Sequence, residues 1–66
     1  MDWTYSVIQH AYIADHEPYR CRVHHGRSGR WTAIVIHEAT VSRGEDFPTA
    51  EAAMAWCEEY VRQASP

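Results

Sequence analysis

The sequence predicts a small α+β domain, in which an antiparallel sheet of three or four strands packs against one C-terminal helix. Apolar and polar residues alternate in the middle of the chain, as is typical of half-buried strands. Residues 49–63 instead place apolar side chains at the helical period. The chain has no leucine, so its core must use valine, isoleucine, alanine, methionine and aromatic residues, which favour a sheet. Residues 1–66 suffice for a single domain.

The first 13 residues show two overlapping patterns. Apolar residues alternate with polar ones over residues 3–7, as in a strand, but Tyr5, Ile8 and Tyr12 have the spacing of a helix. The β-branched and aromatic content favours a strand. We therefore expect an additional N-terminal strand in this segment.

The next elements follow from alternation and from turn residues. Residues 14–18 are polar and predict a connection. Residues 19–25 alternate like a half-buried strand, and the two glycines of residues 26–30 predict a hairpin turn. Residues 31–38 are apolar on both faces and should form the central strand. A weaker strand is expected over residues 39–43.

The predicted helix begins after Thr49, whose hydroxyl can accept a hydrogen bond from a free N–H group of the first turn. Glu51 lies in that turn, where the helix dipole favours a negative charge. Phe47 precedes the cap and is placed to pack against the core, while Trp56 borders the apolar arc and should be half exposed. The apolar arc consists of Ala50, Ala53, Met54, Cys57, Tyr60, Val61 and Ala64.

One helix can cover only one face of the sheet, yet the central strand is apolar on both. The N-terminal segment with Trp3, Tyr5 and Ile8 could cover the second face, or a second copy of the chain could do so. We expect a homodimer.

Charge is distributed unevenly along a chain whose net charge is −3. Residues 1–19 contain three acidic residues and no arginine, and residues 20–43 contain five arginines against one glutamate. Residues 44–66 contain five acidic residues against one arginine, with Glu58 and Arg62 spaced to pair on the helix. The sheet is therefore basic and the helix acidic. Either both faces are simply solvated, or one of them meets a charged partner.

Metal binding and catalysis are not expected. Five residues are candidate metal ligands, but their spacing forms none of the usual zinc motifs: Cys21, His24, His25, His37 and Cys57. No nucleophile motif is present, so we expect no enzymatic activity and no cofactor. No apolar run approaches the roughly 20 residues of a membrane span, and the N-terminus lacks signal-peptide features. We expect a cytoplasmic protein with no membrane partner.

One set of residues resembles a known family. Trp31-x-Ala33-x-Val35, Gly44, Phe47-x-Thr49, Ala53 and Trp56 resemble the three-strand-plus-helix modules at the N-termini of phage tyrosine recombinases. The match spans residues 19–62. These modules are similar to the AP2 DNA-binding fold of plants, whose sheet lies in the major groove. The resemblance implies a small phage or mobile-element protein with DNA-facing arginines, and the negative net charge departs from it.

Two functions compete. The first is a small non-enzymatic protein-binding module, for example a phage-encoded inhibitor of a host defence complex, as anti-CRISPR proteins are. It would use an acidic helix face to bind a protein partner such as a host nucleic-acid-binding complex, through Asp46, Glu51, Trp56, Glu58 and Glu59. The alternative is a nucleic-acid-binding domain that uses the basic sheet, through Arg20, Arg22, Arg27 and Arg30.

Overall fold

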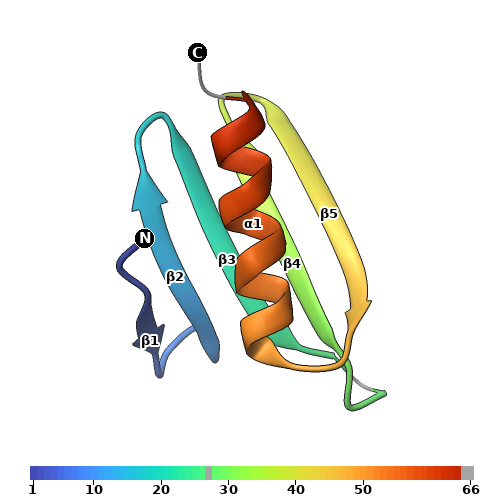
Figure 1. Cartoon of the computed structure of the whole chain (residues 1–66). Helices are drawn as coiled ribbons and strands as arrows, with labels where there is room; N and C mark the ends of the chain where they lie inside the picture. The colour runs from blue at the N-terminus through green and yellow to red at the C-terminus, as the bar shows by residue number, and fades with distance from the viewer. Residues whose placement is uncertain (27, 65–66) are drawn as a thin grey trace.

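The computed structural model describes residues 1–26 and 28–64 and has an α+β fold, as predicted. Five antiparallel strands form one sheet in chain order, rather than the expected three or four, and one helix crosses a single face of that sheet (Figure 1). The strands are β1 Thr4–Ser6, β2 Ala11–His16, β3 Tyr19–His25, β4 Trp31–His37 and β5 Thr40–Phe47, and the helix is α1 Ala50–Ala64.

The first extra strand comes from the N-terminal segment, which is a hairpin rather than one strand. Tyr5 of β1 pairs with Tyr12 of β2, and their ring centroids lie 5.0 Å apart. The spacing that resembled a helix therefore results from two strands facing each other.

The predicted polar connection over residues 14–18 is also wrong. β2 continues to His16, and a two-residue turn then leads into β3. The strand extends because Ala14 is buried opposite Cys21, while Asp15 is bound to Arg20 on the neighbouring strand.

The hairpin between β3 and β4 forms where the glycines predicted it. The backbone N–H of Gly26 donates to the carbonyl of Arg30 at 2.6 Å, and that of Gly29 donates to the carbonyl of Gly26 at 3.2 Å. Gly29 has a φ of 79°, which glycine adopts without a steric penalty. The predicted Arg27 lies outside the described residues.

β5 is longer than the predicted 39–43 and ends at Phe47. Its register shifts opposite Trp31 and Ala33, and Asp46 adopts a φ of 65° there. This irregularity interrupts an edge strand, which reduces its tendency to pair with other chains.

The helix agrees closely with its prediction. The N–H of Ala52 donates to Thr49 Oγ1 at 3.1 Å, so Thr49 caps the helix. Ala64, at the end of the predicted apolar arc, is exposed. Four other residues of the arc are buried: Ala50, Ala53, Cys57 and Val61. Among the described residues, no helix combines the length and the apolar character needed to span a membrane.

The core lies between α1 and the two central strands. Helix residues Ala53 and Cys57 are fully buried, as are Cys21 and Val23 of β3 and Ala33 of β4. These small side chains allow the helix to lie close to the sheet. Each fully buried valine of this layer contributes about 1.5–3 kcal/mol relative to exposure.

The two cysteines are free thiols in this core. A hydrogen bond with Cys21, together with burial, raises the pKa of Cys57 far above its ordinary value. Both thiols are fully buried among apolar side chains, so they pack as small apolar residues.

The N-terminal segment does not cover the second face of the sheet. β1 extends the sheet at its edge, and Trp3 packs against the same core cluster that α1 covers. The face opposite α1 is not overlaid by any described element (Figure 1).

Candidate functional site

The pairing register decides which side chains lie on the face opposite α1. Cross-strand partners project from the same face. Cys21, Val23, Ala33 and Val35 belong to the core beneath α1, so their neighbours along each strand point to the other side. We name this side the open face. It carries Thr4, Ser6, Ala11, Ile13, Asp15, Arg20, Arg22, His24, Thr32, Ile34, Ile36, Val41 and Arg43.

Two arginines flank Ile34 on the open face, on β3 and β5. The predicted central strand, β4, is the fourth of five strands, because β1 and β2 extend the sheet on the other side of β3. Ile34 of β4 pairs with Arg22 on one side and with Arg43 on the other. Ile34 is only 3 % exposed, although α1 covers the opposite side of its strand. Long arginine stems can lie along apolar surface while the charged ends reach solvent. We infer that the two neighbouring stems contribute to this burial and leave two guanidinium groups on the face.

Neither of these arginines forms an ion pair within residues 1–26 and 28–64. Nε of Arg22 is buried and has no hydrogen-bond partner there. Arg20, by contrast, donates from Nε to Asp15 Oδ1 at 2.8 Å, and this contact raises the pKa of Arg20. Asp15 is the single acidic residue among the open-face residues named above, so the face has an excess of positive charge.

The pKa of His24 is affected by the same positive charges. Partial burial lowers the pKa of His24, and the positive charges of Arg22 and Arg43 lower it further. A bound anion would offset this repulsion. The open face is therefore positively charged around His24.

Two of the four arginines predicted to face nucleic acid lie on the open face, namely Arg20 and Arg22. Arg30 instead donates from Nη2 to the backbone carbonyl of Asp46 at 2.7 Å, beside the hairpin. Sequence reasoning did not select Arg43 or His24. The alternation of β3 could have indicated His24, whereas the face of Arg43 depends on the register of β5.

The predicted acidic set on the helix is divided between two flanks. Glu58 accepts a hydrogen bond from Trp3 Nε1 at 2.9 Å and lies 3.5 Å from the N-terminal amino group, on the β1 side. Trp56 lies on the β5 side, where it is half-buried next to Phe47 and Tyr60. The aromatic anchor and this carboxylate therefore do not form one patch.

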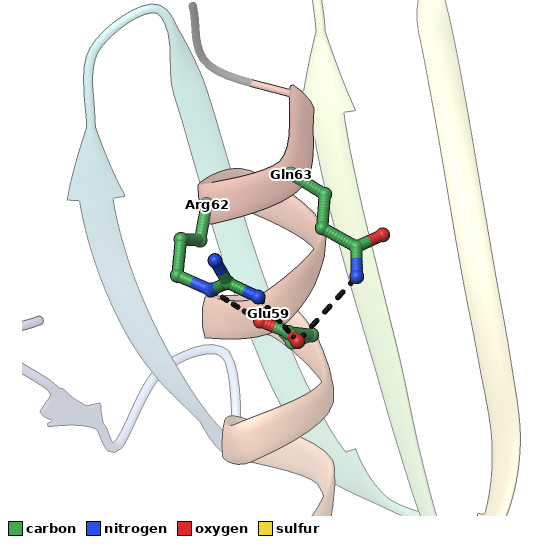
Figure 2. Close-up of polar contacts among 3 residues, drawn as sticks. All are labelled: Glu59, Arg62 and Gln63. Carbon is green, nitrogen blue, oxygen red and sulfur yellow. Dashed lines mark hydrogen bonds and ion pairs between the residues drawn. The ribbon is translucent and has the colours of Figure 1, made fainter.

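Glu59 already has a partner on the helix itself. Figure 2 shows Arg62 donating to both carboxylate oxygens of Glu59, at 2.6 and 2.7 Å, and Gln63 adding a third contact at 3.4 Å. These contacts lower the pKa of Glu59, chiefly through the hydrogen bond from Arg62. The expected pairing of Glu58 with Arg62 is wrong, because Glu58 contacts Trp3 instead. Glu51 and Asp46 are exposed.

The residues with metal-ligating side chains are also spread out. Cys21 and Cys57 lie in the core, while His24 lies on the open face. His25 stacks on Trp31 and His37 on Tyr19, with ring centroids 4.7 and 4.6 Å apart. Across the described part of the chain, no three His, Cys, Asp or Glu residues are grouped so that they could hold a metal ion.

No protein-family model, no curated protein and no solved structure matches this chain.

Proposed function

We propose that the protein is a non-enzymatic binding module whose open face binds a nucleic-acid duplex. The observation that carries the proposal is the separation of charge by face. Arg20, Arg22 and Arg43 lie on the uncovered side of the sheet, while Glu51 and Glu59 lie on the exposed surface of the helix. A chain with a net charge of −3 thus presents a basic surface on one side.

The chemistry of this face suits phosphate groups. Arginine binds phosphate oxygens with paired N–H donors, and each neutralised phosphate releases a counterion from the duplex. Arg22 and Arg43 are free of carboxylate partners among the described residues, so they can bind phosphates without first breaking an ion pair. The two arginines lie on β3 and β5, the two neighbours of β4, so both project from the same sheet.

The resemblance to the recombinase modules supports the same surface. It covers residues 19–62, which correspond to β3, β4, β5 and α1. Because the sheet lies in the major groove in the AP2 fold, the resemblance implies that DNA would meet the sheet here, whose uncovered side is the open face. β1 and β2 would widen that surface.

Anisotropy of a labelled DNA duplex tests the proposal. Arg22→Met combined with Arg43→Met keeps the apolar stems over Ile34 but removes both charges. We expect weaker binding of duplexes of any sequence, and a slope of log affinity against log salt that is smaller by about two.

The matched control changes two charges on the helix. Glu51→Gln with Glu59→Gln avoids Glu58, which contacts the N-terminus. We expect this variant to keep the salt slope of the parent. Equal losses in the two double variants, or no duplex binding by the parent, would contradict the proposal.

A protein partner on the acidic helix is the second candidate function. Glu51 and Asp46 are exposed, and the half-buried Trp56 could serve as an anchor. In this case the Glu51/Glu59 variant, rather than the arginine variant, would lose a basic protein partner. A second copy of the chain seated on the open face would instead give a dimer mass in light scattering.

A further inference from the structure

A hollow lies where the turn between β1 and β2 meets the end of β3. Its volume is about 260 Å³, and its lining residues are Gln9, His10, Arg22, His24 and His25. We name it the turn pocket. One edge of the pocket belongs to the open face through Arg22 and His24. No carboxylate lines it among the residues that the structure describes.

Every side chain of the turn pocket can donate a hydrogen bond. Arginine carries a permanent positive charge, the glutamine amide has two N–H donors, and each imidazole has one or two. Nε of Arg22 is buried and lacks a hydrogen-bond partner among the described residues, so the terminal nitrogens of its guanidinium group are the ones left to meet a ligand.

The turn itself is held in a defined conformation. The N–H of Gln9 donates to Ser6 Oγ at 3.2 Å. His10 adopts a φ of 53°, a left-handed conformation that is uncommon for residues other than glycine. The fixed turn thus holds Gln9 and His10 at the pocket edge.

We propose that the turn pocket binds a phosphate group, with Arg22 as its fixed charge and Gln9 and the histidines as further donors. A water occupies about 30 Å³ in the liquid, so the pocket has room for a phosphate and several waters. The inference deepens the proposed function, because in a duplex complex the group bound would be a backbone phosphate. The pocket chemistry applies equally to free phosphate.

The test is a titration of the protein with sodium phosphate, followed by amide and imidazole NMR shifts, against sodium chloride at equal ionic strength. We expect saturable shifts at Gln9, His10 and His24 with phosphate only. Arg22→Met should weaken phosphate binding about tenfold or more, because it removes a charge-assisted hydrogen bond.

Two further variants separate a pocket from a diffuse charge effect. His10→Gly removes an imidazole while suiting the positive φ, so it should weaken binding without unfolding the turn. Arg43→Met is the matched control, since Arg43 does not line the pocket. It should change phosphate affinity less than about twofold, because only screened long-range attraction is lost. Equal losses in Arg22→Met and Arg43→Met, or identical shifts with chloride, would overturn the pocket.

A final titration distinguishes the two sources of phosphate. If free phosphate displaces a bound duplex at constant ionic strength, the pocket takes a backbone phosphate. If phosphate binds without displacing the duplex, its ligand is a separate free phosphate. Saturable phosphate shifts in a protein that binds no duplex would support the pocket and contradict the proposed function.

Discussion

Beneath α1, the valines of the central strands are buried by other apolar side chains, whereas on the open face Ile34 is buried between two arginines. Water is excluded from the strands on both faces, but only beneath α1 are the covering side chains themselves apolar residues of the core. The arginine stems of the open face carry charged ends, and burying these fully would be costly, as Nε of Arg22 already lacks a hydrogen-bond partner among the described residues. One face therefore stabilises the fold, while the other leaves charge available for a partner.

The two faces also differ in the exposed fraction of residues of the same type. Val61 on α1 is 3 % exposed, and Val41 on the open side of β5 is 61 % exposed. Residue type alone does not separate these two valines, so substitutions at both positions measure the contrast directly.

The largest effect is expected from Val61→Asp. The substitution places an unpaired charge between α1 and the sheet, and it should lower the free energy of unfolding by about 3 kcal/mol or more. Val41→Asp is the matched control and should change it by less than about 0.5 kcal/mol. Urea denaturation of both variants makes the comparison, and equal losses would show that the two faces are buried alike.

A smaller effect is expected where β5 passes beneath the helix aromatics. A Cβ at Gly44 would lie 2.9 Å from Trp56 Cε2 and 3.0 Å from the ring of Phe47. Gly44→Ala should therefore lower the free energy of unfolding by about 1–3 kcal/mol through overpacking.

A double-mutant cycle checks this cause. Trp56→Phe removes the indole atom nearest to Gly44, so the combined variant should lose less stability than the sum of the single losses. Strict additivity would show that Trp56 does not limit the space at Gly44.

The smallest effect concerns the open face and depends on pH. The pKa of His24 lies below its ordinary value of 6.5 in the folded protein, so the unfolded chain binds more protons as the pH falls through this range. The contribution of His24 to the free energy of unfolding is complete above 6.5 and decreases as the pH falls toward the folded pKa. His24→Gln should flatten this dependence in urea denaturation at several pH values. If the free energy of unfolding of the parent and the variant depended equally on pH, His24 would not be a source of that dependence.

The helix and the hairpin between β3 and β4 could be predicted from local sequence. Thr49 caps a segment whose apolar period lies within one element, and Gly29 supplies the positive φ that its turn needs. The alternation of residues 19–25 likewise separated Arg20 and Arg22 from Cys21 and Val23. These features depend on residues close together in the chain, so no distant partner was needed to infer them.

The remaining features were decided by partners far away in the sequence. The first hairpin depends on Tyr5 lying against Tyr12, and the free side of Arg43 depends on the register of β5 against β4. Arg62 could pair with Glu58, four residues earlier, or with Glu59, three residues earlier. Glu58 instead accepts a hydrogen bond from Trp3, 55 residues away in the sequence, and Arg62 pairs with Glu59. The sequence by itself therefore determined the class of fold, the helix and the presence of a basic strand segment. Only the tertiary structure decided which arginines share the open face, because a shared face is set by cross-strand pairing and not by spacing along the chain.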